Sequence, residues 1–135
     1  MRVSIYRKAH FNAAHRLYVN EWSEEKNWEV FGKCANPNYH GHNYELEVKL
    51  TGEIDPVTGY FINLKTVSDL IKVHVEEVLD HKNLNLDIPE LQGIIPSTEN
   101  LVYYIWKTLR KELADEIELS VRLWESPRNS AEYPA

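Results

Sequence analysis

Three side chains that lie close together in the chain can bind a metal or move a proton: Cys34, His40 and His42. From His42 onward, polar and apolar residues alternate as far as Leu50, which is the pattern of a half-buried strand. Alternate residues of a strand face the same side, so a strand that begins at His40 points both imidazoles toward the apolar, inward side. Two inward imidazoles need a proton partner or a metal. Cys34 precedes them across a Pro-containing bend and can fold back toward the same place.

A third histidine, His15, follows another alternating segment, residues 3–11. It shares the parity of the apolar residues there, so it faces inward if the strand continues that far. Three neutral imidazoles are a donor set that suits zinc, and three protein ligands leave one coordination position open. The alternative is that His15 only caps a strand, while His40 and His42 lie in a solvated loop.

Cys34 and the pair Asp80–His81 are candidates for proton transfer. Polar neighbours such as Lys33 and Asn36 set Cys34 apart from an ordinary core cysteine. A thiol near a cation or metal ionises more easily and becomes a base or nucleophile, whereas the alternative is a small buried apolar side chain. Asp80 could orient His81 as a base. However, adjacent side chains rarely hydrogen-bond productively to each other, and a polar loop at the end of a helix explains the pair equally well.

Glu125 continues the inward parity of the alternating segment 117–123. A carboxylate on an inward face is costly unless it is paired. A flat ligand that offers two N–H groups, such as the amidine edge of a guanine-like ring, would satisfy both carboxylate oxygens. The alternative is a salt bridge with Arg122 or Arg128.

Length, charge and cysteine count restrict the class of protein. The 135 residues are enough for one domain, which we expect to span residues 1–135. The formal net charge of −6, with scattered Lys and Arg, argues against a nucleic-acid surface. No apolar run reaches membrane-spanning length, and the N-terminus lacks an apolar signal core. A lone cysteine cannot form an internal disulfide, which fits a reducing compartment. We therefore predict a soluble, cytoplasmic protein without a nucleic-acid or membrane partner.

The periodicity of the whole chain predicts an α+β domain with an antiparallel sheet and its helices on one face. The expected strands are residues 3–11, 40–51, 60–62, 117–123 and 131–133. One helix is expected over residues 64–79, after an Asn63 N-cap. A second helix begins near residues 96–99, with Ser97 or Thr98 as its cap and Glu99 as an ordinary first-turn acid. Residues 17–32 and 80–87 are polar and are predicted to be loops.

These motifs together resemble those of the 6-pyruvoyl tetrahydropterin synthase family, over essentially the whole chain. The matching segments are residues 14–17 (AHRL), 34–44 (CANPNYHGHNY), 52–59 (GEIDPVTG), 79–84 (LDHKNL), 97–100 (STEN) and Glu125. The resemblance implies a tunnelling fold (T-fold), in which a four-stranded antiparallel sheet carries two helices on one face. It also implies that trimers close these sheets into a barrel and that two trimers stack into a hexamer.

The resemblance assigns a role to each candidate residue. The implied zinc ligands are His15, His40 and His42. The implied catalytic residues are the general base Cys34 and the acid–base pair Asp80 and His81, which would reach the site from a neighbouring subunit. The implied pterin-binding residues are Glu125, Thr98 and Glu99.

The implied reaction converts 7,8-dihydroneopterin triphosphate to 6-pyruvoyl tetrahydropterin with loss of triphosphate, and zinc acts as the Lewis acid. The 6-carboxy-tetrahydropterin synthases of queuosine biosynthesis share the zinc site and the substrate but release acetaldehyde. They usually have a shorter gap between the cysteine and the histidine pair, and an Asp at the position of Asn63. The longer gap after Cys34 favours the pyruvoyl enzymes. Residues 20–28 match neither pattern, and a non-catalytic, zinc-stabilised pterin-binding module is the most distant alternative.

Overall fold

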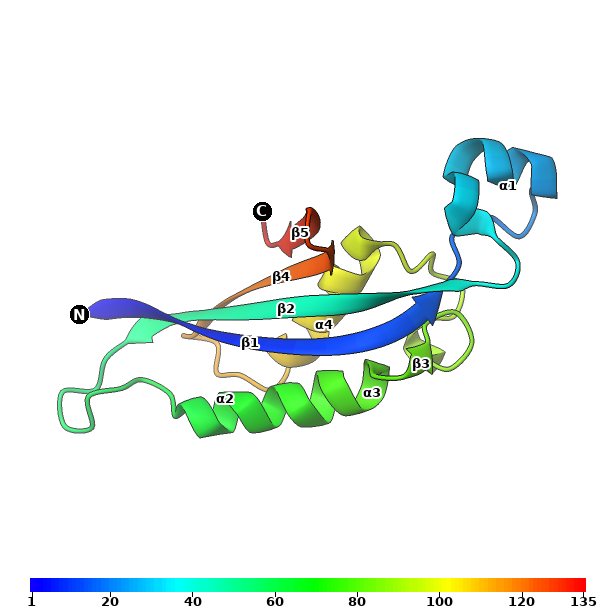
Figure 1. Ribbon diagram of the computed structural model, residues 1–135. Coiled ribbons are helices and arrows are strands. Elements are labelled where there is room, and N and C mark those ends of the chain that lie inside the picture. The colour runs from blue at the N-terminus through cyan, green and yellow to red at the C-terminus, as the bar shows by residue number, and fades with distance from the viewer.

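A five-stranded sheet with helices on one face forms the body of the protein. The computed structural model describes all of residues 1–135. Its strands are β1 Arg2–His15, β2 His40–Glu53, β3 Lys82–Asn83, β4 Glu118–Ser126 and β5 Asn129–Tyr133. Its helices are α1 Glu24–Phe31, α2 Leu64–Ile71, α3 Glu77–Leu79 and α4 Thr98–Arg110. The strand order is β3-β1-β2-β4-β5, and α2, α3 and α4 cover one face of the sheet (Figure 1). No helix is both long and apolar enough to cross a membrane.

The two long strands β1 and β2 pair antiparallel along their whole length, from Arg2 opposite Glu53 to His15 opposite His40. Their apolar residues alternate onto the face that the helices cover. On that face the rings of Phe11 and Tyr44, which lie opposite each other, stack with their centroids 4.9 Å apart. The expected extension of both strands to their histidines is therefore confirmed, together with the inward direction of that face.

The helical segment after the β1–β2 pair is unbroken from residue 64 to residue 79, because a π-helical turn, Lys72–Glu76, joins α2 to α3. It begins after Asn63, whose side chain accepts a hydrogen bond from a backbone N–H of the first turn. It ends at Leu79, as predicted. Such π-helical turns are rare, and they replace the regular hydrogen bonds of an α-helix with bonds between residues five positions apart.

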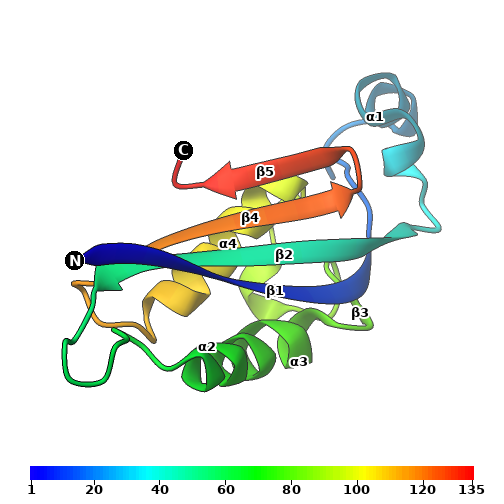
Figure 2. The same ribbon diagram turned by 60° about the vertical axis from the view of Figure 1, so that its left-hand side comes forward.

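The second long helix, α4, begins after Ser97, whose hydroxyl accepts a hydrogen bond from the Asn100 N–H at 3.2 Å. Figure 2 shows α2, α3 and α4 lying against the same face of the sheet. The buried core between the two layers includes Leu46, Val48, Leu50, Val121 and Leu123 from the sheet and Val67, Ile71, Val75, Leu79, Leu101, Ile105 and Leu109 from the helices.

The sheet has five strands, not the four that the resemblance implies, and one of its pairs is parallel. The additional strand, β3, lies in a segment that was predicted to be a loop. It pairs with the end of β1 through Ala13 opposite Lys82 and Ala14 opposite Asn83. A two-residue strand on a sheet edge is held by backbone groups, so neither its composition nor its periodicity distinguishes it from a loop.

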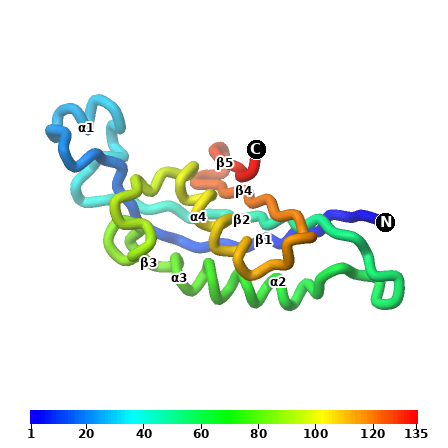
Figure 3. The backbone as a smooth tube through the Cα atoms, turned by 180° about the vertical axis from the view of Figure 1, so that it is seen from behind, coloured from blue at the N-terminus to red at the C-terminus, as the bar shows by residue number.

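The predicted loop over residues 17–32 is also wrong in part, because it contains α1. The hydroxyl of Ser23 caps this helix by accepting a hydrogen bond from the Lys26 N–H at 3.1 Å, and two acidic residues occupy its first turn. This is an ordinary helix start, which the polar composition of the segment masked. Figures 1 and 3 show α1 standing apart from both layers, at the end of the sheet opposite the N-terminus.

Residues 60–62 were expected to form a strand but are irregular. Phe61 folds back over the end of β2 instead and packs against Gly52. A Cβ atom at Gly52 would lie 2.5 Å from Cδ2 of the Phe61 ring, so glycine is the residue that allows this contact.

We expect Gly52→Ala to lower the free energy of unfolding by about 1–3 kcal/mol, because the Phe61 ring must shift to admit the methyl group. Urea denaturation followed by circular dichroism measures the change. Adding Phe61→Leu, which shortens the obstructing side chain, should recover part of the loss. Full stability in the single variant would contradict the close contact.

Candidate functional site

Three imidazoles meet at the end of the sheet near α1. His15 lies opposite His40 in the β1–β2 ladder, and His42 follows two residues later on the same face. The ring centroids are 4.6 Å apart for His15 and His40, 4.9 Å for His15 and His42, and 4.9 Å for His40 and His42. One nitrogen from each ring lies within 4.8 Å of the other two. The structure therefore brings together the three histidines that the strand parity selected.

The nitrogens of this triad have the character of metal ligands. Nδ1 of His15 donates a hydrogen bond to the Pro96 carbonyl at 2.8 Å, which leaves the lone pair on its Nε2 free. Nε2 of His15, both ring nitrogens of His40 and Nε2 of His42 are buried without a hydrogen-bond partner in the protein. Burial lowers the pKa values of His15 and His40, and the neighbouring imidazoles lower them further. Neutral, unpaired imidazoles are what a zinc ion requires, so these residues fit the metal that the resemblance implies.

Tyr44 is a site residue that the sequence indicated only as part of the strand. Its hydroxyl lies 3.4 Å from Nδ1 of His15, and its ring meets those of His15 and His42 edge to face. Burial raises the pKa of Tyr44 far above its ordinary value, so the phenol keeps its proton. The sequence feature that could have identified Tyr44 as a site residue is its position on the inward face, two residues after His42.

Glu125 lies beside the triad, as its parity predicted. One carboxylate oxygen is 3.6 Å from Nε2 of His42, and the other accepts a hydrogen bond from the Thr98 hydroxyl at 2.7 Å. No arginine pairs with it: Arg122 donates to the Ser130 hydroxyl at 3.2 Å instead. The expected alternative, a salt bridge to Arg122 or Arg128, is therefore absent, and the carboxylate remains available to a ligand.

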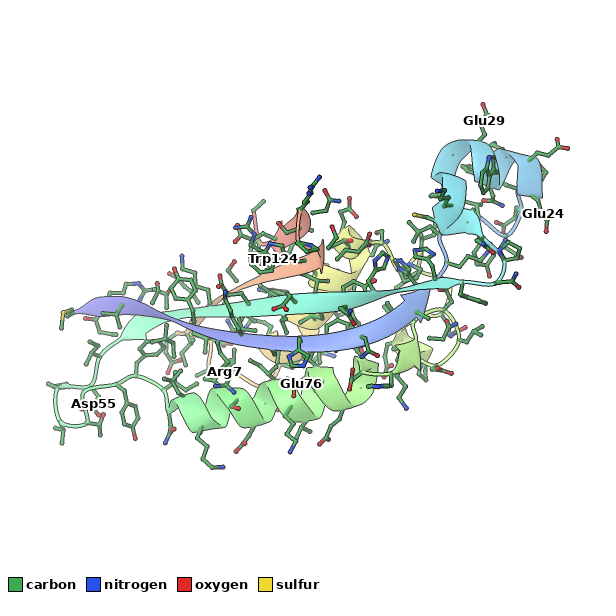
Figure 4. The ribbon with its side chains drawn as sticks, viewed as in Figure 1. Arg7, Glu24, Glu29, Asp55, Glu76 and Trp124 are labelled. Atoms are coloured by element: carbon green, nitrogen blue, oxygen red, sulfur yellow. The ribbon has the colours of Figure 1, made fainter.

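A cavity of about 720 Å³ opens next to this carboxylate, at the ends of β2 and β4. Trp124, which lies on β4 (Figure 4), lines this cavity. Its lining includes Gly41, His42, Asn43, Trp124, Glu125 and Ser126. His42 of the triad and the Glu125 carboxylate thus border one space large enough for a bicyclic ring with a side chain.

Cys34 lies in a 3₁₀ turn, Gly32–Ala35, that is tied to the chain just after His15 by a hydrogen bond from the Leu17 N–H to the Cys34 carbonyl at 2.8 Å. The side chain is half-buried. Burial raises the pKa of the thiol, and the negative charge of Glu125 raises it further. Both effects favour the protonated form of the thiol.

The chain returns from this turn to β2 through Tyr39, which has φ +67°. Left-handed backbone is rare for an aromatic residue, and such strain is found most often at functional sites.

Asp80 and His81 lie beside the end of β1, on the edge that pairs with β3. The expectation that adjacent side chains would not bond is wrong here: Nδ1 of His81 lies 2.9 Å from a carboxylate oxygen of Asp80, and the backbone of His81 has φ +60°. The Asn12 N–H bonds the other oxygen at 2.9 Å and, together with His81, lowers the pKa of Asp80. The His81 ring is largely exposed and, together with His42 of the triad, borders a second cavity, of about 470 Å³.

The two remaining candidates occupy the start of α4. Thr98 joins the site through its bond to Glu125. Glu99 is exposed in the first turn of the helix and makes no side-chain hydrogen bond. Within one chain, the structure brings together the three histidines, Glu125 and Thr98 and places the Cys34 turn next to the end of β1, whereas Glu99 is exposed and the Asp80–His81 pair lies at the sheet edge.

Comparison with known proteins agrees with this arrangement. The model of the family "6-pyruvoyl tetrahydropterin synthase" matches residues 4–135. The chain belongs to this family. A Homo sapiens protein named 6-pyruvoyl tetrahydrobiopterin synthase is 40% identical over 132 residues, which are 98% of this chain and 91% of the relative.

Other members of the family extend the comparison. The solved structure of the Caenorhabditis elegans 6-pyruvoyl tetrahydropterin synthase has a TM-score of 0.91 and 33% identity, with 98% of this chain and 95% of that chain covered. A Pyrococcus furiosus relative, 35% identical over 129 residues and covering 93% of this chain and 91% of its own, is named dihydroneopterin monophosphate aldolase. Relatives of this chain at similar identity therefore carry names for different reactions.

We expect the purified protein to bind about one zinc per chain and the His40→Ala variant to lose it. Both ring nitrogens of His40 are buried and have no hydrogen-bond partner in the protein, which leaves them available to a metal. Elemental analysis after gel filtration measures the metal content. His10→Ala, which removes an exposed imidazole from the same pair of strands, is the matched control and should keep its zinc. Stoichiometric zinc in His40→Ala would refute the ligand assignment.

Proposed function

We propose that this chain is a zinc-dependent lyase that converts 7,8-dihydroneopterin triphosphate to 6-pyruvoyl tetrahydropterin and triphosphate. The observation that carries the proposal is the cluster of buried, unpartnered imidazoles beside the free carboxylate of Glu125. The first is a metal site with three protein ligands, and the second is an acceptor for a ring that offers two N–H groups. Family membership supports the assignment of that ring as a pterin.

Glu125 and Thr98 bind and orient the pterin ring of the substrate. The Thr98 hydroxyl occupies one lone pair of the carboxylate and fixes its plane, which leaves an acceptor on each oxygen for the amidine edge of the pterin. His15, His40 and His42 would hold zinc at the other end of the site, next to the substrate side chain. When bound, zinc would supply a Lewis acid beside the side-chain hydroxyls and a positive charge that favours the Cys34 thiolate.

Proton transfer falls to Cys34 and to the Asp80–His81 pair. Cys34 takes a proton from a side-chain carbon, and Asp80 and His81 of the partner subunit form the second acid–base pair. Tautomerisation moves two hydrogens from the alcohol next to the ring onto the ring, so this alcohol becomes a carbonyl as the ring reaches the tetrahydro level. Loss of a proton from the carbon that bears the second hydroxyl breaks the bond between the terminal carbon and the triphosphate oxygen, and the enol that results tautomerises to the second carbonyl and a methyl group. Oxidation and reduction balance within the substrate, and no nicotinamide cofactor takes part.

An oligomer is part of this proposal, because the acid–base pair of one chain faces outward. The sheet ends in two edges, β5 on one side and, on the other, the part of β1 that β3 leaves unpaired. Asp80 and His81 lie on that second edge. Edge-to-edge pairing of such sheets into a trimeric barrel, and stacking of two trimers into a hexamer, would carry the pair into a neighbour's site. We place the enzyme in the cytoplasm, where a catalytic thiol stays reduced.

The reaction product tests the proposal. We expect 6-pyruvoyl tetrahydropterin as the main product of an anaerobic reaction with 7,8-dihydroneopterin triphosphate, together with triphosphate and little acetaldehyde. Mass spectrometry with an aldehyde trap measures all three. Acetaldehyde formed in step with triphosphate would indicate the 6-carboxy-tetrahydropterin synthase of queuosine biosynthesis. Carbon–carbon cleavage without triphosphate release would indicate an aldolase, and absence of turnover in zinc-loaded protein would indicate a binding module.

We expect Glu125→Gln to weaken pterin binding at least about tenfold while zinc content stays the same. An amide accepts only one of the two N–H bonds and presents a donor to the other, and hydrogen bonds to charged groups contribute about 1.5–3 kcal/mol each. Fluorescence titration with neopterin measures the affinity. Glu29→Gln, which neutralises an exposed carboxylate on α1, is the control (Figure 4). Equal affinity in the two variants would remove Glu125 from the pterin site.

A further inference from the structure

One arginine connects the metal triad to the cysteine turn. Arg16 directly follows the metal-ligand candidate His15, and its Nε donates a hydrogen bond to the Ala35 carbonyl at 2.9 Å. The next residue, Leu17, donates its N–H to the Cys34 carbonyl at 2.8 Å. Two consecutive carbonyls of the 3₁₀ turn are therefore held by two consecutive residues at the end of β1.

The backbone of Arg16 is itself fixed from the other side. The side chain of Asn85 accepts a hydrogen bond from the Arg16 N–H at 2.8 Å and donates one to the Arg16 carbonyl at 2.9 Å. In this way an amide side chain continues the pairing that β3 makes with β1 beyond the point where β3 ends. Gln92 secures Asn85 in turn, by donating to its carbonyl at 3.0 Å.

The guanidinium of Arg16 is also held in a defined orientation. It lies over the Tyr18 ring, with Cζ 4.0 Å from the ring centroid, and the side chain is half-buried. Stacking and the single directed hydrogen bond from Nε limit the rotamers that the long side chain can adopt. Of these contacts, the hydrogen bond from Nε reaches the turn that carries Cys34, and the others hold the arginine that makes it.

We propose that Arg16 is a positioning residue that fixes the Cys34 thiol relative to the histidine triad. The effect on catalysis that we expect from Arg16 rests on the proposed function. A displacement of about 1 Å of a proton-transfer group can lower the reaction rate on the order of 10²-fold. The hydrogen bond from Nε to Ala35 performs the positioning, and the charge of Arg16 is secondary.

The competing role for Arg16 is to bind the triphosphate of the substrate. The surroundings of the guanidinium favour positioning. The cavity it borders, of about 510 Å³, is also lined by Glu24 and Glu25, and these carboxylates repel a polyanion. Figure 4 shows Glu24 on α1, the helix that stands over this part of the chain.

Two substitutions separate the hydrogen bond from the charge. Arg16→Gln removes the charge but places an N–H donor, Nε2, at the same point along the side chain as Nε of arginine. Arg16→Lys keeps the charge but places a methylene group at that point. If Arg16 positions the thiol, the glutamine variant should recover most of the activity that the lysine variant loses. If Arg16 binds triphosphate, the order of the two variants should reverse.

We expect Arg16→Lys to lower kcat by about 10–100-fold with little change in KM, and Arg16→Gln to stay within about threefold of the parent. The second readout does not depend on turnover. Cys34 is the only cysteine in the chain, so alkylation by iodoacetamide reports this one thiol. Losing a hydrogen bond from a charged donor should open the turn and speed alkylation about tenfold in Arg16→Lys, with a smaller change in Arg16→Gln. Circular dichroism and zinc content confirm that the compared proteins are folded and metal-loaded.

A higher KM in Arg16→Gln, with normal kcat and normal alkylation in Arg16→Lys, would overturn the proposal in favour of triphosphate binding. Equal alkylation rates in the parent and both variants would overturn it as well, because the turn would then not depend on this contact. If the parent protein makes no 6-pyruvoyl tetrahydropterin, the proposed function fails, while the alkylation rates still decide whether Arg16 holds the thiol.

Discussion

The antiparallel register of β1 and β2 is the constraint on which the whole site depends. It sets His15 opposite His40 and, through the two-residue period of a strand, places His42 on the same face. A slip of one residue would turn the inward face of one strand outward, removing the imidazoles from each other and Tyr44 from the core. The apolar pairs in the middle of the ladder therefore fix the geometry of the polar end. Stability of the core and assembly of the site follow from one pairing.

That polar end is costly for the folded chain. Four buried imidazole nitrogens have no partner in the protein, and an unsatisfied buried polar group costs about 1–3 kcal/mol. Burial holds His15 and His40 neutral, which is the state that binds a metal. The core beneath the sheet tolerates this cost, and a bound metal would convert it into folding free energy. The triad is therefore a group of ligand atoms that could hold a metal ion.

Periodicity predicted what depends on side chains facing a core. The strand parity of His15, His40, His42 and Glu125, and the helix ending at Leu79, are all present in the structure. What the sequence did not reveal depends on backbone and on local capping. β3 is a two-residue edge strand, α1 begins with a cap inside a polar segment, and the left-handed backbone of His81 lets its ring reach Asp80. These features leave no hydrophobic pattern, so periodicity cannot find them.

The division between strands and loops explains how one fold serves several reactions. The proposed metal ligands and the carboxylate proposed to bind the pterin lie on long, paired strands, whose register leaves little freedom. The proposed proton-transfer groups lie elsewhere: Cys34 in a turn held by Arg16, and the Asp80–His81 pair beside an edge strand. A shift of about 1 Å in such a turn would move the proposed base relative to a bound side chain while leaving the paired strands in place. Relatives of similar identity that are named 6-pyruvoyl tetrahydrobiopterin synthase and dihydroneopterin monophosphate aldolase are consistent with such an arrangement.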